Sequence, residues 1–387
     1  MFDNTLLFRP TYAFVDLSAI AHNFNVLQSM VPYKVGLLGM VKADAYGHGA
    51  IEVSKVLLKC GACALGVATV EEGIELRGSK IDAPILVMGG LMGMGGSAAD
   101  EMVKADLTPV IHSVGVVNCL EDAAAKEKKL MPVHIKVDTG MSRLGVRPES
   151  LSSLLEALST CKWIQVQGVM THFANASDKE YTSYQMKLFF NAKDQIENKL
   201  GSIPIWHLGN SAAIAEGAVI GNDTSKQYWV RPGIGLYGSA DGVDIPKSLD
   251  LKPAMGLYSK VALLKRVPKG TAVSYGCTFI TSRNTRLAVI PIGYADGYRF
   301  IFANKACVLI RGKRASVIGR ITMDMIMVDV TEVDGISVGD EVVLIGRQGK
   351  ESITADEMAL WADTISYEIF CGISKRIPRV YSSRKTK

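Results

Sequence analysis

The sequence has no apolar run long enough to cross a membrane, and its opening, MFDNTLLFRPTYAF, lacks the parts of a secretion signal. The formal charge of +5 is spread thinly over 387 residues, and the one dense basic run is the C-terminal SKRIPRVYSSRKTK. A nucleic-acid footprint would need stronger clustering of basic residues. These absences favour a cytoplasmic protein that binds neither nucleic acid nor a membrane.

Metal-binding and disulfide patterns are also missing. The six histidines form no H-E-x-x-H pairing, and no P-loop is present. Seven cysteines, an odd number scattered along the chain, favour reduced thiols over a disulfide framework. Cys60 and Cys63 have the spacing of a redox pair or half a zinc site, but no second C-x-x-C is present. We interpret them as small buried residues in a loop between a helix and a strand, and expect no metal.

One glycine-rich stretch resembles a dinucleotide-binding fingerprint. GMGGSA, residues 93–98, follows the apolar run APILVMG, as a G-x-G-x-x-G/A motif would. It lies inside a longer series of strand–helix units, however, and no acidic residue ends the next strand at the required distance. We therefore expect no dinucleotide site there.

What the sequence does contain is a long series of alternating strands and helices. From residue 12 to about 240, β-branched apolar runs alternate with helical periods, which indicates parallel strands buried on both faces. After the first run, Ser18 is a candidate helix cap. The nine candidate strands are AFVDL, KVGLLGMVKA, ALGVATV, APILVMG, LTPVI, PVHIKVD, IQVQGVMTHF, PIWHLG and WVRPGIGLYG. A (β/α)8 barrel has eight places, so one strand, such as the first, should pair elsewhere.

The character of the sequence changes near residues 240–250. Beyond GSADGVDIPKSLD, runs such as TRLAVIPIG, MIMVDV and DEVVLIG follow one another with Gly-rich turns and no long helix between them. Such spacing is typical of a β-rich domain. The sequence therefore predicts an α/β protein with an N-terminal (β/α)8 TIM-type barrel over residues 12–243. A mainly-β C-terminal domain is expected over residues 244–387.

A lysine stands at the end of one predicted barrel strand. The working groups of such barrels lie where strands end and loops begin, and Lys42 in VKADAYGHGA falls at such a point. A lysine desolvated among small residues can have a lowered pKa and form a Schiff base. Taken alone, Lys42 would be interpreted as one of the 43 lysine and arginine residues, in a solvated loop.

The run VKADAYGHG resembles the pyridoxal-phosphate attachment motif of the alanine racemase family. Further blocks resemble that family in its order, over nearly the whole chain. They are HIKVDTGMSRLG (134–145), VMTHFANA (169–176), HLGNSAA (207–213), RPGIGLYG (231–238), VSYGCTF (273–279), GYADGY (293–298), GRITMD (319–324) and SYEI (366–369). The resemblance implies a barrel followed by a β-domain, with the first strand joining the C-terminal domain.

The resemblance also implies two bases on opposite faces of the substrate, because racemisation removes a proton from one face of the α-carbon and returns it on the other. Lys42 would attach pyridoxal 5'-phosphate and then act as one base, and Tyr275 would be the other. A free tyrosine has a pKa of about 10, so Tyr275 needs nearby positive charge or hydrogen bonds. His172 and Arg231 match a family relay toward it.

Arg231 also matches the arginine that the family directs at the pyridine nitrogen of the cofactor. Since arginine keeps its proton, the ring nitrogen would stay unprotonated, and the ring would be a weaker electron sink. This suits an enzyme that returns the proton and avoids transamination. The other cofactor-binding positions implied are Tyr46, Asn210, Ser211, Gly233, Ile234 and Tyr367.

For the substrate carboxylate, the matched positions are Arg143, a good bidentate partner, and the backbone around Met323. Many family members have glycine where this chain has Ser142. Lys136 matches a lysine that is carbamylated in some members and then holds Arg143 in place.

The family pattern further implies a homodimer with shared active sites. The residues that would reach the opposite barrel are Tyr275, Tyr294, Arg320, Met323 and Asp324. The implied activity is the interconversion of L-alanine and D-alanine, supplying D-alanine for peptidoglycan. Alternatives are a serine or broad-specificity racemase of the same fold, a non-catalytic pyridoxal-phosphate carrier, which lacks the second domain, and a barrel aldolase without cofactor. Tyr294 and Tyr367, matched to residues that narrow the entrance, favour alanine.

Overall fold

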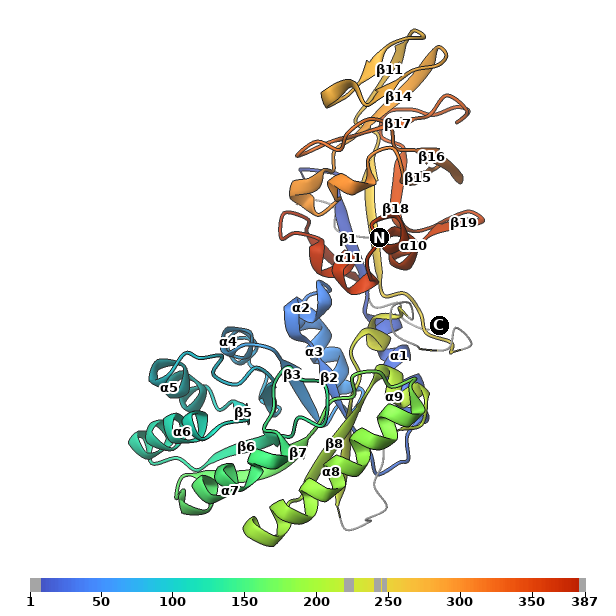
Figure 1. Cartoon of the computed structure of the whole chain (residues 1–387). Coiled ribbons are helices and arrows are strands. Elements are labelled where there is room, and N and C mark those ends of the chain that lie inside the picture. The colour runs from blue at the N-terminus through green and yellow to red at the C-terminus, as the bar shows by residue number, and fades with distance from the viewer. Residues whose placement is uncertain (1–7, 219–225, 240–244, 246–248, 383–387) are drawn as a thin grey trace. The chain divides into compact units, whose positions relative to one another are not determined.

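The computed structural model describes residues 8–218, 226–239, 245 and 249–382, which form two compact units (Figure 1). The barrel unit consists of residues 20–45 and 49–252. The β unit takes in the chain up to residue 19, residues 46–48 and the chain from residue 253 onward. The predicted boundary between residues 243 and 244 lies outside the described residues.

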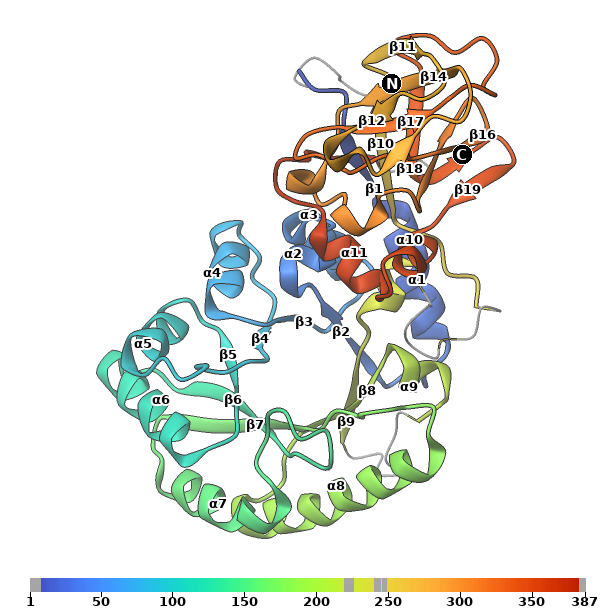
Figure 2. The same ribbon diagram turned by 45° about the horizontal axis from the view of Figure 1, so that its top comes forward.

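Eight parallel strands close the barrel unit, in the order β2 to β9 (Figure 2). They are β2 (Gly36–Met40), β3 (Ala64–Val67), β4 (Ile85–Val87), β5 (Thr108–Ile111), β6 (Met131–Lys136), β7 (Ile164–Met170), β8 (Ile205–Asn210) and β9 (Gln227–Arg231). Strands β3, β4 and β5 are buried along their whole length, because parallel strands are covered on both faces. The pairing of β2 with β9 completes the circle.

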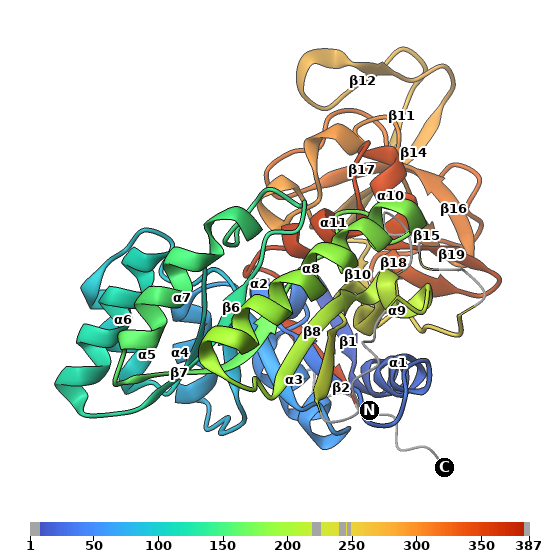
Figure 3. The same ribbon diagram turned by 60° about the horizontal axis from the view of Figure 1, so that its bottom comes forward.

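Helices surround these strands, and α5, α6 and α7 pack in sequence against one another (Figure 3). The helices of this part of the chain are α1 (Leu17–Ser29), α2 (Lys42–Tyr46), α3 (Ala50–Lys59), α4 (Val70–Gly78), α5 (Gly96–Lys104), α6 (Val114–Glu127), α7 (Leu151–Thr160), α8 (Lys179–Leu200) and α9 (Ser211–Ala215). Side chains cap several of them, such as Ser113 at α6 and Asp178 at α8.

The cap of the first helix, α1, differs from the prediction. Asp16, not Ser18, accepts the first free N–H groups, those of Ser18 and Ala19, because a carboxylate is the stronger acceptor.

The first strand, β1 (Tyr12–Asp16), is not part of the barrel. This confirms the prediction that one of the nine candidate strands pairs elsewhere. It pairs with β10 (Met255–Lys260) and β20 (Arg379–Ser382) in a seven-stranded sheet. The remaining strands of that sheet are β15 (Cys307–Ile310), β16 (Lys313–Ser316), β18 (Glu341–Gln348) and β19 (Glu351–Ile353). A second sheet contains β11 (Leu263–Val267), β14 (Thr285–Ile290) and β17 (Ile326–Asp329), while β12 (Ala272–Val273) pairs with β13 (Phe279–Ile280). Two short helices, α10 (Ala355–Trp361) and α11 (Ser366–Gly372), complete the unit.

The two motifs that we set aside lie in ordinary connections. Cys60 and Cys63 are free and partly buried between α3 and β3, and burial raises the pKa of Cys63 to about 12. Such a thiol is a poor nucleophile. The stretch 93–98 covers the end of the connection between β4 and α5 and the first three residues of α5, which begins at Gly96. Across the described part of the chain, no helix combines the length and apolar character needed to cross a bilayer.

Candidate active site

Lys42 lies two residues beyond the end of β2 and begins an unusual turn. The next four residues, from Ala43 to Tyr46, all have φ between 52° and 54°. A left-handed backbone costs about 1–2 kcal/mol for each non-glycine residue. The turn is held by hydrogen bonds from Ala45 N–H to Val41 O (2.8 Å) and from Gly49 N–H to Asp44 O (2.9 Å). Strained backbone conformations of this kind cluster at active sites and ligand-binding sites, where they fix the direction of a functional side chain.

Arg231 ends β9 and is 3% exposed. Its Nη2 donates to the carbonyl oxygens of Thr171 (2.6 Å) and Leu208 (2.8 Å). Its Nη1 is buried and has no hydrogen-bond partner among the described residues. Burial lowers the pKa of the guanidinium to about 9, so it remains a cation at neutral pH. An unmet buried donor on a cation is costly, so this N–H is suited to an acceptor that is not part of the protein.

His172, just after β7, accepts from Arg231 Nη2 at its Nδ1 (3.2 Å), because arginine can only donate. Burial and then the positive charges of Arg231, Lys136, Arg143 and Lys42 lower its pKa. The imidazole is therefore neutral, with its proton on Nε2. Because all four charges act on His172, these predicted residues lie near one another in the barrel unit.

Lys136, the last residue of β6, is 6% exposed. Burial, followed by Arg231 and Arg143, lowers its pKa to about 8. Arg143 is exposed, in a loop where Asp138 Oδ1 accepts from the N–H groups of Gly140 (3.1 Å) and Ser142 (3.0 Å). Ser142 has φ 55°, in the left-handed region. Glycine adopts this conformation without strain, so a glycine would fit this position more easily than serine does.

Ser211 links two chain segments in the barrel unit. Its Oγ accepts from Gly233 N–H (2.9 Å) and Gly235 N–H (3.3 Å), just before and within the short 3-10 helix η3 (Ile234–Tyr237). Asn210, not Ser211, caps α9, by accepting from Ala213 N–H (2.9 Å). A hydroxyl and several backbone amides at the start of two helical turns are the donors that a phosphate group takes.

Two buried histidines that the sequence argument passed over also lie in the barrel. His134 Nδ1 and His207 Nε2 are 2.8 Å apart. Burial lowers the pKa of both, to about 3 for His134. Gly168 makes room for the pair, since a Cβ there would lie 2.3 Å from His134 Nδ1. Both imidazoles are therefore neutral.

In the β unit, Tyr46 and Tyr367 pack against each other, with ring centroids 5.7 Å apart. Burial raises the pKa of Tyr46 and raises that of Tyr367 to about 12. Both phenols therefore keep their protons at neutral pH. They can act as hydrogen-bond donors to an anion.

Tyr275 lies in the short 3-10 helix η4 (Tyr275–Cys277) and is 72% exposed. The loop is fixed by the hydrogen bond from Ser274 Oγ to Arg320 O (2.7 Å). Gly276 has φ 71°, and a Cβ there would lie 2.8 Å from the guanidinium carbon of Arg320. The backbone is thus closely packed, while the phenol ring projects from it.

Tyr294 and Met323 are exposed on two loops that support each other. Tyr294 N–H donates to Thr322 O (3.0 Å), and the loops approach so closely at Gly293 that a Cβ would clash with Thr322 O. Asp324, the last predicted residue of this group, accepts from Arg376 Nη2 (2.8 Å).

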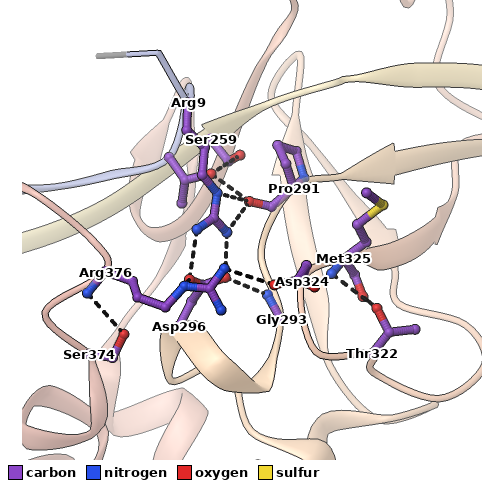
Figure 4. Close-up of polar contacts among 11 residues, drawn as sticks. Arg9, Ser259, Pro291, Gly293, Asp296, Thr322, Asp324, Met325, Ser374 and Arg376 are labelled. Carbon is purple, nitrogen blue, oxygen red and sulfur yellow. Dashed lines mark hydrogen bonds and ion pairs between the residues drawn. The ribbon is translucent and has the colours of Figure 1, made fainter. Parts of the chain in front are cut away.

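A buried carboxylate, Asp296, organises these loops (Figure 4). It ends the 3-10 helix η5 (Tyr294–Asp296) and accepts from both Nη atoms of Arg9 and from Gly293 N–H (3.0 Å). Arg376 Nε lies 3.4 Å from its Oδ1. Asp296 was not among the predicted site residues, although it lies within the block GYADGY.

A second missed residue is Glu72, in the first turn of α4. It forms a capping box with Thr69, a pattern that the spacing T-x-x-E would have predicted. Its carboxylate also accepts from the backbone of Ala43, next to Lys42 (2.7 Å).

Comparison with known families matches the whole described architecture. Residues 15–241 match the family "Alanine racemase, N-terminal domain", and residues 254–381 match "Alanine racemase, C-terminal domain". The alanine racemase of Halothermothrix orenii is 44% identical over 383 residues, covering 98% of this chain and 99% of the relative. Alanine racemase 2 of Caldanaerobacter subterraneus subsp. tengcongensis is 42% identical, with 99% and 97% covered.

Solved structures agree. The alanine racemase of Bacillus anthracis with bound L-Ala-P has a TM-score of 0.90 at 34% identity, covering 98% of this chain and 97% of that one. The alanine racemase of Bartonella henselae with covalently bound pyridoxal phosphate has a TM-score of 0.81 at 28% identity, with 96% and 99% covered. The barrel followed by a mainly-β domain is therefore confirmed as the fold.

Proposed function

Because the chain belongs to the alanine racemase family, we propose that it interconverts L-alanine and D-alanine with pyridoxal phosphate and supplies D-alanine for peptidoglycan. The observation that carries this proposal is Arg231. Its Nη1 is a buried cationic donor without a protein acceptor among the described residues. An unprotonated pyridine nitrogen would supply that acceptor.

Other residues of the chain fit the cofactor as well. Ser211, with the backbone of Gly233 and Ile234, would hold the phosphate group, and the protonated phenols of Tyr46 and Tyr367 would donate to it. Asn210 keeps Ser211 in place by capping α9. When bound, pyridoxal phosphate withdraws electrons from the substrate's α-carbon and so acidifies its proton.

The chain's own groups would then move that proton. Lys42 Nζ takes or returns it on one face of the α-carbon, and Tyr275 of the partner subunit does so on the other. Arg143 binds the substrate carboxylate, together with the backbone around Met323 of the partner subunit. His172 is neutral, and its Nε2–H can donate onward in a relay that links Arg231 to Tyr275.

The expected substrate is small. Tyr294 and Tyr367 would narrow the entrance, so that steric exclusion selects the methyl side chain. Added methylenes alone change binding by only about 1–3 kcal/mol each. A serine or broad-specificity racemase is the alternative, and kcat/KM values for alanine, serine and lysine separate the two.

A complementation experiment tests the shared site. Lys42→Ala and Tyr275→Phe should each be nearly inactive as homodimers. In a randomly mixed population about half of the dimers are mixed, and each would contain one intact site of two, giving about a quarter of wild-type activity. No recovery would place both bases within one chain. If the wild-type protein neither attaches pyridoxal phosphate nor exchanges the α-proton of alanine into deuterated water, the function itself is wrong.

A further inference from the structure

The turn after Lys42 needs external support. Four consecutive non-glycine residues, 43–46, are left-handed, and each pays a clash between its Cβ and the following carbonyl oxygen. Without restraint, the backbone would relax toward an ordinary helical or extended conformation. Lys42 stands at the start of this turn, so such relaxation would change the direction of its side chain.

Glu72 supplies a restraint from the neighbouring strand–helix unit. Its Oε1 accepts from Ala43 N–H at 2.7 Å. Its Oε2 accepts from Ala68 N–H (2.6 Å) and Thr69 N–H (3.3 Å), just beyond β3. One carboxylate therefore ties the residue after Lys42 to the end of the adjacent barrel strand, with charge-assisted hydrogen bonds.

A helix-capping role does not account for this arrangement. In a capping box, the glutamate at the third helical position binds only the backbone N–H of the cap residue, which here is Thr69. The bonds to Ala43 and Ala68 are additional and lie outside α4. We propose that Glu72 is a positioning residue for Lys42, acting through the left-handed turn. This inference rests on the proposed function, in which Lys42 attaches the cofactor.

The sharpest variant is Glu72→Gln. An amide keeps the shape but has one acceptor oxygen, and its nitrogen only donates. Either Ala43 N–H or Ala68 N–H would then face a donor. The matched control is Thr69→Ala, which removes the Oγ1 that accepts from Glu72 N–H (3.4 Å). The control breaks the capping box of α4 but leaves the bond to Ala43 intact.

The measurement follows cofactor release from the purified holoprotein by absorbance, together with kcat and KM for alanine. Glu72→Gln should accelerate release about 5- to 10-fold and lower kcat more than it changes KM. Thr69→Ala should lower the melting temperature by a few degrees and leave release within about twofold. Equal release from both variants, or wild-type release from Glu72→Gln, would overturn the inference.

A double variant tests the route of action. Glycine adopts a left-handed conformation without a Cβ clash, so Ala43→Gly in the Glu72→Gln background should recover much of the slow release. Continued fast release in the double variant would show that Glu72 does not act through the strained turn.

Borohydride trapping and peptide mapping on the wild-type protein distinguish a failure of the proposed function from a failure of the inference about Glu72. If Lys42 is not the labelled residue, the proposed function and the inference both fail. If it is, a failed Glu72 test refutes the inference alone.

Discussion

Arg231, Lys136 and Ser211 in the barrel unit are buried, whereas Tyr275, Tyr294 and Met323 in the β unit are exposed. The chain's own groups bind Arg231 Nη2 and Ser211 Oγ, while Arg231 Nη1 has no partner among the described residues. Tyr275 and Met323 are more than half exposed, yet their backbones are closely packed. We propose that the buried residues of the barrel form the binding site. The β unit presents exposed side chains on closely packed loops, and we propose that these side chains reach a second copy of the chain.

The difference has a physical basis in how each unit treats charge. In the barrel, several cations lie near buried groups, so desolvation and the neighbouring positive charges lower the pKa values of His172 and Lys136. In the β unit, the buried charge is neutralised, because Asp296 lies between Arg9 and Arg376. The first arrangement suits an anionic ligand such as a phosphate or carboxylate. The second stabilises loops.

The largest expected effect is that of Tyr275→Phe. Losing one of two bases should lower racemisation about 10²–10⁴-fold, most severely in the direction in which tyrosine removes the proton. Bound cofactor should be unaffected, because the residues that hold it lie elsewhere. Rates in both directions, followed by polarimetry, check this. The control is Tyr33→Phe, at a fully exposed tyrosine, and near wild-type activity of Tyr275→Phe would refute the two-base assignment.

Asp296→Asn should have the next largest effect. Removing a buried charge leaves Arg9 without its counterion, which costs about 3 kcal/mol of unfolding free energy. Activity should also fall, since the loops of Tyr294 and Met323 lose their support. Urea denaturation measures the stability change. Asp324→Asn is the matched control. It breaks only an exposed pair with Arg376 and should cost about 1 kcal/mol or less, so equal losses would argue against a special role for Asp296.

The sequence predicted the barrel well because parallel strands buried on both faces consist of short apolar runs, such as ALGV and TPVI, which can be recognised without knowing their partners. It could not by itself decide that β1 pairs with β10 and β20, because pairing partners far apart in sequence leave no local pattern. The family resemblance implied only that the first strand joins the C-terminal domain. The sequence predicted Ser18 as the cap of α1, but the carboxylate of Asp16, two residues earlier, takes that role.

The site was predictable only in part, for a similar reason. Every proposed cofactor and substrate residue came from matched blocks, but the residues that hold them were missed. Glu72 acts on Ala43 across 29 positions, and Arg9 binds Asp296 across 287. Both are tertiary contacts made by common residue types. The left-handed turn at residues 43–46 could not be predicted from the sequence either, because alanine, aspartate and tyrosine rarely adopt a left-handed backbone in succession.

The smallest effect tests the crowding of positive charge in the barrel. Burial and the nearby arginines lower the pKa of Lys136 from 10.5, the value of a free lysine, to about 8. Below pH 8 both states bind the proton, and the folded state carries the full desolvation cost. Between pH 8 and 10.5 the folded state loses its proton first, so stability rises with pH there. Lys136→Met should remove this rise, on the order of 2 kcal/mol relative to wild type. Chemical denaturation at pH 7, 8.5 and 10 measures this change in stability with pH, with Lys187→Met at an exposed position as the control.

A neutral amine is also the form of Lys136 that carbon dioxide carbamylates, so added bicarbonate should stabilise the wild-type protein and not Lys136→Met. If the two proteins keep the same pH dependence and the same response to bicarbonate, Lys136 is an ordinary cation and the barrel is less desolvated than its burial indicates.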